Sequence, residues 1–194
     1  MSYLTREERR AQIVDAAVSL TISDGLAAAT VRAVAAVIDA SPGQIHHHFS
    51  SADALRAEAF REFGLRLAKR YDHIRDSLTP IDQLRLLLDC EASDSGPGVE
   101  RLWKEAIFTS CQNNLIRESV QTVLESWRVR VAAALHAVVD ERGLAVTGDL
   151  HASSQRLIGI AIGWDLLTDF NFQMPDSNKN LSSYIDFELL SLGC

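Results

Sequence analysis

Three consecutive histidines, His46, His47 and His48, are the residues whose types first indicate a chemistry. Imidazole is a good metal ligand, but neighbouring residues of a helix differ in direction by about 100°, so three successive rings point apart. The pattern therefore disfavours a metal site, and we expect no cofactor. Exposed imidazoles near the end of a helix are better suited to contact phosphates or base edges of DNA, and we predict this role for His46 and His47.

The polar segment before the histidines carries a second candidate function. Ser41, Pro42 and Gln44 place a hydroxyl at a helix N-cap, a proline at the first helical position and a glutamine that can reach back to the cap. With Gly43 between them, the first turn of this helix is small and polar enough to enter a major groove. There glutamine can pair with adenine and backbone N–H groups with phosphate. Capping and base contact compete for Gln44, and we favour base contact.

Two short helices joined by a tight turn are predicted to position these side chains. Thr30 is a good N-cap for the first helix, and its hydroxyl can alternatively hold a phosphate. The apolar residues that follow at helical spacing are Val31, Val34, Ala35 and Ile38. Arg32 points away from them and is a further phosphate candidate. The second helix begins after Ser41 and ends near Phe49, with Ile45 facing the core, so the pair forms a helix-turn-helix.

The rest of the chain is predicted to form helices separated by turns. A helix capped by Thr5 and Glu8 ends at Gly25, for which we expect the left-handed conformation common at helix ends. A long helix over residues 50–77 can link two domains. Further helices are expected after Pro80 and over residues 99–111. Another includes Ile116 to Val138 and ends at Gly143, and the last two begin at Asp149 and cover 181–192. No segment alternates with period two long enough to make a sheet, so the predicted fold class is all-α.

The order of these motifs resembles the DNA-binding domain of the TetR family of bacterial repressors, over roughly residues 5 to 55. The resemblance is carried by the amphipathic helix with its glycine turn, Thr30-Val31-Arg32, Ser41-x-Gly43-x-Ile45-x-x-His48-Phe49 and Asp53-x-Leu55. Asp39 stands in the inter-helix turn where the family usually has glycine, and aspartate tolerates a left-handed backbone. His46 and Ala52 replace a tyrosine and a lysine that usually hold phosphate in the family.

The resemblance implies a domain organisation and a set of DNA-binding residues. Residues 1–49 would form a three-helix helix-turn-helix domain, linked by the helix 50–77, and residues 50–194 a helical bundle for effector binding and dimerisation. The predicted DNA-binding residues are Thr30, Arg32, Ser41, Pro42, Gly43, Gln44, His46 and His47, whereas His48 is structural in the family pattern. The dimer would read double-stranded operator DNA with near-palindromic sequence, one half-site for each recognition helix.

The same resemblance implies partners for the C-terminal domain. Helices near 149–172 and 181–192 would pair with their copies in a two-fold homodimer. An unidentified small apolar or amphipathic effector would bind among residues that include Trp103, Phe108, Cys111, Trp127 and Trp164. Aromatic residues at helical spacing are also typical of an ordinary core, and the residues alone do not choose between a pocket and a core.

Composition and charge set limits on these predictions. The chain of 194 residues has a formal net charge of −7, which argues against a general nucleic-acid-coating protein. Through Arg75 it holds ten Lys and Arg against nine Asp and Glu, and beyond it nine against seventeen, which fits DNA contact over one small surface. The three cysteines include no Cys-x-x-Cys pair. With no basic-then-apolar leader and no apolar run long enough for a membrane span, we expect a cytoplasmic protein without a membrane partner.

Two alternatives to an effector-released repressor remain at this stage. The sequence has no nucleophile elbow, glycine-rich phosphate loop or metal-binding helix motif, so we predict no enzymatic activity. A helical enzyme or small-molecule carrier with an incidental helix-turn-helix is nevertheless the rival from another class. The second alternative is a DNA-binding protein without an effector, in which Trp103 and Trp127 are solid core. The sign of regulation, repression or activation, is also open.

Overall fold

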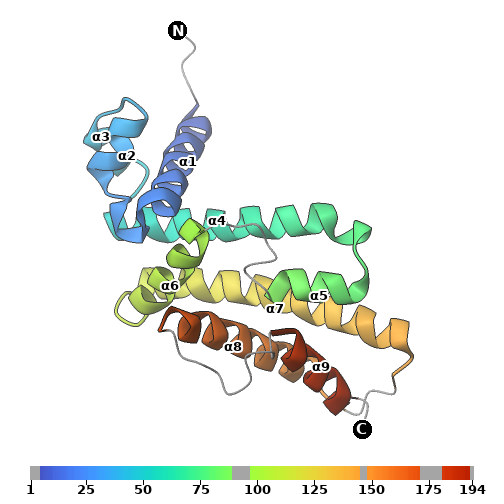
Figure 1. Cartoon of the computed structure of the whole chain (residues 1–194). Helices are drawn as coiled ribbons and strands as arrows, with labels where there is room; N and C mark the ends of the chain where they lie inside the picture. The colour runs from blue at the N-terminus through green and yellow to red at the C-terminus, as the bar shows by residue number, and fades with distance from the viewer. Residues whose placement is uncertain (1–4, 89–96, 145–147, 171–180, 193–194) are drawn as a thin grey trace. The chain divides into compact units, whose positions relative to one another are not determined.

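The computed structural model describes residues 5–88, 97–144, 148–170 and 181–192 (Figure 1). The α-helices among them are α1 (Arg6–Asp24), α2 (Val31–Val37), α3 (Pro42–His46), α4 (Ala52–Ile74), α5 (Pro80–Leu88), α6 (Pro97–Ser110), α7 (Asn114–Arg142), α8 (Leu150–Asp169) and α9 (Leu181–Leu192). Two short 3-10 helices, η1 (Leu26–Ala28) and η2 (Arg75–Ser77), follow α1 and α4. The described residues contain no strand, so the all-α prediction is confirmed. Residues 171 and 172 of the predicted dimer helix, Cys90 and Cys194 lie outside this part of the chain.

The first helix begins as predicted and ends differently. Thr5 Oγ1 accepts the Glu8 N–H at 3.2 Å and the Glu8 carboxylate accepts the Thr5 N–H at 2.7 Å, a complete capping box. The hydrogen bond from the Thr5 backbone is the main cause that lowers the pKa of Glu8. Gly25 has φ of 95° but ψ of 166°, so the left-handed helical conformation expected there is wrong. The chain instead extends at Gly25 because it turns directly into η1.

The turn between α2 and α3 forms with aspartate at the position that favours glycine. Asp39 has φ of 49° and is the non-glycine residue with positive φ in the described chain. Around it the Ala40 N–H donates to Ala35 O at 2.8 Å, and the Asp39 N–H donates to Ala36 O at 3.4 Å. This pair of bonds is a Schellman motif, which satisfies the last carbonyls of a helix. The expectation that aspartate supports this turn is therefore confirmed.

The chain divides into two compact units. The first unit lies within residues 1–68 and 95–124 and contains α1 to α3, most of α4, α6 and the start of α7. Residues with no exposed surface in its core include Ile13, Ala17, Val34, Ile45, Leu55, Phe60 and Leu102. α4 and α7 come close at Gly64, where a Cβ would lie 2.5 Å from both methyl carbons of Val123.

The second unit lies within residues 69–94 and 125–194 and contains the end of α4, α5, the rest of α7, α8 and α9. In it α8 packs against both α5 and α9. Its buried apolar side chains include Leu84, Leu88, Leu135, Val138, Leu157, Ile185 and Leu189. The boundaries of the units fall inside α4 and α7, and the predicted domain boundary after Phe49 stays a prediction.

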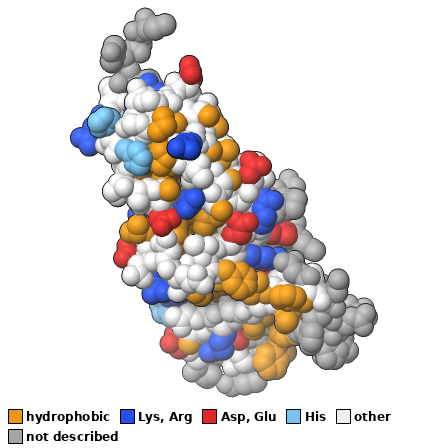
Figure 2. All heavy atoms as spheres, turned by 90° about the vertical axis from the view of Figure 1, so that its left-hand side faces the viewer, with side chains coloured by type: hydrophobic (Ala, Val, Ile, Leu, Met, Phe, Trp, Pro, Cys, Tyr) orange, Lys and Arg blue, Asp and Glu red, His pale blue; other side chains and the backbone are white. Residues whose placement is uncertain are grey.

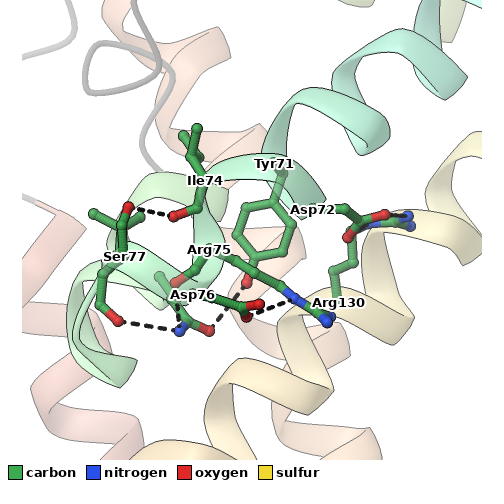
Figure 3. Close-up of polar contacts among 9 residues, drawn as sticks. Tyr71, Asp72, Ile74, Arg75, Asp76, Ser77 and Arg130 are labelled. Atoms are coloured by element: carbon green, nitrogen blue, oxygen red, sulfur yellow. Dashed lines mark hydrogen bonds and ion pairs between the residues drawn. The ribbon is translucent and has the colours of Figure 1, made fainter.

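The end of α4 lies a few residues before the predicted end near Ser77, because polar contacts tighten the chain there (Figure 3). Ser77 Oγ donates to Ile74 O at 2.6 Å, across the η2 turn. The side-chain amide of Gln83 in α5 donates to Arg75 O at 2.9 Å. Side chains thus bind the last carbonyl of α4 and the first carbonyl of η2, where another α-helical turn would otherwise supply the N–H donors.

Within the second unit, α4 is also joined to α7 and α5 by side chains (Figure 3). Arg130 of α7 donates to the two carboxylate oxygens of Asp72 at 3.1 and 2.5 Å, a bidentate ion pair. The Tyr71 hydroxyl donates to Gln83 at 3.4 Å, and burial is the main cause that raises the pKa of Tyr71. These contacts fix the orientation of the last two turns of α4 within this unit.

Candidate nucleic-acid interface

The first turn of α3 is exposed, while the helix is anchored from behind. Ser41 has an extended backbone, with φ of −82° and ψ of 149°, and its Oγ accepts the Gln44 N–H at 3.3 Å. Pro42 occupies the first helical position, as predicted. Ser41, Pro42, Gly43 and Gln44 are all exposed, whereas Ile45 is completely buried. A short helix is thus held by its apolar residue and presents its polar turn outward.

The side chain of Gln44 is not used by its own helix. The return bond of a capping box, from the Ser41 N–H to the Gln44 side chain, does not form, in contrast to the complete box of Thr5 and Glu8. Within the described residues the Gln44 amide has no hydrogen-bond partner. Gln44 therefore does not act as a cap through its side chain, and its amide is available to an external ligand.

The N-terminal end of α2 carries two further predicted residues. Thr30 Oγ1 accepts the Ala33 N–H at 3.1 Å, so Thr30 is the expected N-cap, and its side chain is exposed. Arg32 is exposed and forms no ion pair with any residue that the structure describes. An unpaired guanidinium beside an exposed helix start is well placed for a phosphate contact.

The three histidines lie at and just beyond the end of α3, and they differ in exposure. His46 and His47 are exposed and His48 is half-buried. Burial is the main cause that lowers the pKa of His48, followed by the positive charges of Arg6 and Arg10. No group of three or more potential ligands is placed to bind a metal ion in the described ranges of the chain.

Arg10 positions α3 in a way that the sequence does not reveal. Its guanidinium forms an ion pair with Glu58 of α4 at 2.7 Å and lies 5.0 Å from the ring centroid of Phe49. Phe49 follows α3 and is buried, so Arg10 ties α1 and α4 to the end of the helix-turn-helix. Residues 10 and 58 are too far apart in sequence for any periodic pattern to pair them.

Cationic and imidazole side chains gather on one face of the first unit. Figure 2 shows histidine side chains near Lys and Arg side chains on this face, with apolar side chains among them. The predicted DNA-binding residues of α2 and α3 all belong to this unit and all are exposed. The surface therefore combines hydrogen-bond donors, an arginine without an ion-pair partner and a small-residue helix start.

The residues predicted to line an effector site are divided between the two units. Trp103 belongs to the first unit, where its ring centroid lies 5.3 Å from that of Phe60 and 6.3 Å from that of Phe63, both in edge-on geometry. Phe108 is 61% exposed, and Cys111 is also exposed. In the first unit, then, Trp103 packs against the core and the other two lie on the surface.

Trp127 and Trp164 belong to the second unit. The Trp127 indole N–H donates to Leu87 O at 2.8 Å, and the ring of Trp164 packs edge-on against Tyr184 with centroids 5.8 Å apart. Both tryptophans are half-buried. The assignment of the five residues to an effector site stays a prediction.

Large apolar side chains are exposed directly after α8 and along α9 of the second unit. The exposed fractions are 76% for Phe170, 70% for Phe187 and 70% for Leu190. On α8, a Cβ added at Gly159 or Gly163 would meet no atom within 4 Å, so this helix has a stripe that no part of the described chain covers. Apolar side chains and uncovered glycines together are typical of a surface that packs against another helix.

Comparison with known proteins connects these features to a family. Residues 13–59 match the family model described as bacterial regulatory proteins, tetR family. This match confirms the resemblance that the sequence shows over its first 55 residues. No curated protein matches the chain by sequence. No helix of the described residues is long and apolar enough to cross a membrane.

Several solved structures share the fold over almost the whole chain. A protein assigned as a TetR-family transcriptional regulator from Mesorhizobium loti has a TM-score of 0.70 at 17% identity, over 97% of each chain. A protein assigned as a transcriptional regulator from Saccharomonospora viridis, in complex with choline, has 0.68 at 17%, over 94% of each chain. The regulator FadR from Bacillus subtilis, in complex with stearoyl-CoA, has 0.62 at 18%, over 94% of this chain and 97% of its own.

Proposed function

We propose that this chain, a DNA-binding transcriptional regulator whose residues 13–59 form a TetR-family domain, is a repressor that binds a palindromic operator as a homodimer and leaves it when a small molecule binds. One observation carries this proposal: α3 turns its exposed polar first turn outward while Ile45 and Phe49 are buried behind it. This is the arrangement that a recognition helix needs to enter a major groove.

The roles of the reading residues follow from their chemistry. Gln44 has a free amide that can donate to and accept from an adenine edge, so it reads sequence. Arg32, Thr30 and His47 contact phosphates, which position the domain without reading bases. His46 lies at the end of α3, where it contacts the backbone or the last base. Ser41, Pro42 and Gly43 supply the small turn that lets the helix approach.

The homodimer is supported by the apolar surface of α8 and α9. Phe187 and Leu190 of α9 are exposed in the single chain, and Gly159 of α8 leaves room for a helix of a second chain. Burying such side chains in a two-fold interface removes apolar surface from water. Two recognition helices in one dimer then bind two half-sites together, which raises affinity far above that of one.

The effector is proposed to be an amphipathic small molecule that binds among the C-terminal helices. Structures of the same fold hold choline and stearoyl-CoA, which pair an apolar or methylated part with a charged one. Trp164 and its partner Tyr184 offer aromatic surface for such a ligand in the second unit. The effector releases DNA only if it binds the non-DNA-binding conformation better, and a tenfold preference corresponds to about 1.4 kcal/mol.

This function requires no catalytic group, and we propose that the protein is not an enzyme. Its action takes place in the cytoplasm, where its target DNA is accessible.

Selection of bound duplexes from a random DNA pool tests the proposal. We expect a palindromic consensus, one dimer for each duplex in sedimentation, and an affinity that falls steeply as the salt concentration rises. A reporter gene placed behind this consensus should be silenced by the protein. A monomeric chain, or a pool without enrichment at low salt, would contradict the proposal. Increased reporter expression would contradict repression but keep operator binding.

A further inference from the structure

The joint between α1 and α2 contributes to the orientation of α2 and α3, which carry the predicted DNA-binding residues. It consists of Gly25, with its extended backbone at positive φ, and of η1, which leads to the N-cap of α2. α2 packs on both α1 and α3, so a displacement at this joint changes the seat of α2 on α1 and carries α3 with it. All of these elements belong to the first unit.

At the end of α1 the Gly25 N–H binds Thr21 O, but the carbonyls that follow need partners from elsewhere. The last turn of α1 contains no basic residue, and the carbonyls of Ile22 and Ser23 lie beyond the reach of further helical N–H groups. Arg101 of α6 supplies the cation instead, and its Nη2 donates to Ile22 O at 3.1 Å and Ser23 O at 2.7 Å. A cation at this position also interacts favourably with the helix dipole.

The N–H group of Leu26 at the start of η1 is bound by the same helix. It donates to Oε2 of Glu105 at 2.5 Å, a bond between a backbone donor and a carboxylate. Gly25 is needed for this contact as well as for its backbone, since a Cβ there would lie 2.7 Å from Oε1 of Glu105. Arg101 Nε lies 3.8 Å from the same oxygen, so the pair on α6 is also electrostatically coupled.

Three residues on one face of α6 therefore meet the end of α1 and the joint. Gly98, Arg101 and Glu105 follow one another at spacings of three and four, which places them in one row on the helix. A side chain at Gly98 would collide with the carbonyl of Ile22, so α6 begins in direct contact with α1. Arg56 of α4 holds the other side of η1, where it donates to Ala27 O at 3.1 Å.

We propose that Glu105 and Arg101 are positioning residues for operator binding, which clamp the α1–η1 joint and so fix the orientation of α2 and α3. The inference rests on the proposed function and deepens it, because it assigns to α6, which supplies none of the predicted DNA-binding residues, a part in setting operator affinity. Glu105 makes the larger contribution, since it satisfies a backbone N–H that has no other partner in the described chain. Arg101 adds a smaller one through the end of α1.

The test compares variants of the full-length protein in operator binding, with the selected palindrome and an unrelated duplex as probes. Glu105→Ala should weaken operator binding about tenfold and leave binding to the unrelated duplex nearly unchanged, because phosphate contacts tolerate a loosely oriented helix. Glu105→Gln keeps an acceptor and should restore part of the affinity. Arg101→Ala should cost about threefold. The matched control is Glu118→Ala, which removes an exposed carboxylate of α7 in the same unit.

Hydrogen exchange shows whether the contact between Glu105 and the α1–η1 joint exists in solution, independently of whether the protein binds an operator. The Leu26 amide, and with it the amides of α2, should exchange faster in Glu105→Ala, while Ile13 in the centre of α1 stays protected if the variant is folded. Wild-type affinity in a folded Glu105→Ala variant would overturn the inference and leave the proposed function intact. Absence of operator binding in the wild-type protein would instead overturn the proposed function. A Leu26 amide that exchanges equally fast in both proteins would show that the clamp is not formed in solution.

Discussion

The two candidate binding surfaces of this protein, one in each unit, differ in their chemistry. In the first unit the candidate DNA-binding residues include the exposed polar side chains of Arg32, Gln44 and His47, and Val34 and Ile45 of the same helices are buried behind them. In the second unit Phe187 and Leu190 are exposed, whereas the carboxylate of Glu188 on the same helix is buried and paired with Arg156. The first surface fits a charged, hydrated polymer, and the second fits another apolar surface.

This contrast shows how differently the two surfaces are specified. The predicted DNA-binding residues between Thr30 and His47 form the reading surface. They come from one continuous segment, so local helix rules position most of them. In the proposed homodimer the α8–α9 surface is covered by a second copy of the chain, so the helix rules of one chain do not specify its contacts. Substitutions that disrupt one surface and leave the other intact therefore test the function proposed for each surface.

The largest effect is expected from charge placed on the second surface. Phe187→Glu should leave the fold intact, because the side chain is 70% exposed, but it should prevent dimer formation. Loss of one half-site contact should weaken operator binding by about 100-fold. Sedimentation and anisotropy titration measure the two effects. Val129→Glu, at an apolar side chain of α7 that is 52% exposed, is the control and should change neither.

Substituting one tryptophan in each unit distinguishes a core residue from a residue of the effector site. Trp103→Ala removes a ring that packs on Phe60 and Phe63, and should lower the free energy of unfolding by about 3 kcal/mol. Trp164→Ala should cost less stability and abolish the thermal shift caused by amphipathic ligands. Chemical denaturation and a ligand screen measure these outcomes. If ligands still stabilise Trp164→Ala as they do the wild type, this tryptophan is not part of the effector site.

Two substitutions on the reading surface separate base reading from backbone contact. Gln44→Ala should reduce the preference for the consensus over a site with one changed adenine by about tenfold. His47→Ala should lower affinity for every duplex alike, by about threefold, since it removes one hydrogen bond to phosphate. Competition titrations with both duplexes measure the ratio. Unchanged preference in Gln44→Ala would assign base reading to other residues.

The smallest effect concerns pH and is confined to the first unit. The pKa of His48 lies below the ordinary value of 6.5, because the ring is half-buried and near Arg6 and Arg10. Above pH 6.5 the ring is neutral in both states, and as the pH falls the unfolded chain binds the proton more readily, so stability decreases. The melting temperature should therefore fall less between pH 7.5 and 5.5 in His48→Gln than in the wild type. Equal decreases would show that other groups cause the pH dependence.

Local sequence rules predicted the helix-turn-helix well, because the residues that cap its helices and form its turn are adjacent in sequence. The caps at Thr5, Thr30 and Ser41 all form, and Asp39 supports its turn as expected. Local rules failed where a partner from elsewhere replaced a local one. Gly25 extends because η1 follows it, and the chain after Ile74 forms η2, in which the Arg75 carbonyl accepts a hydrogen bond from Gln83 of α5.

The sequence by itself determined the helices, the exposed first turn of α3 and the family resemblance, because each depends on residues within a few positions of one another. Only the tertiary structure showed that Glu105 holds the N–H of Leu26, that Arg10 pairs with Glu58, and that Trp103 packs on the core of the first unit. Such contacts join residues far apart in the chain, and which of them meet is decided by how the helices pack, since a periodic pattern specifies a face but not its partner.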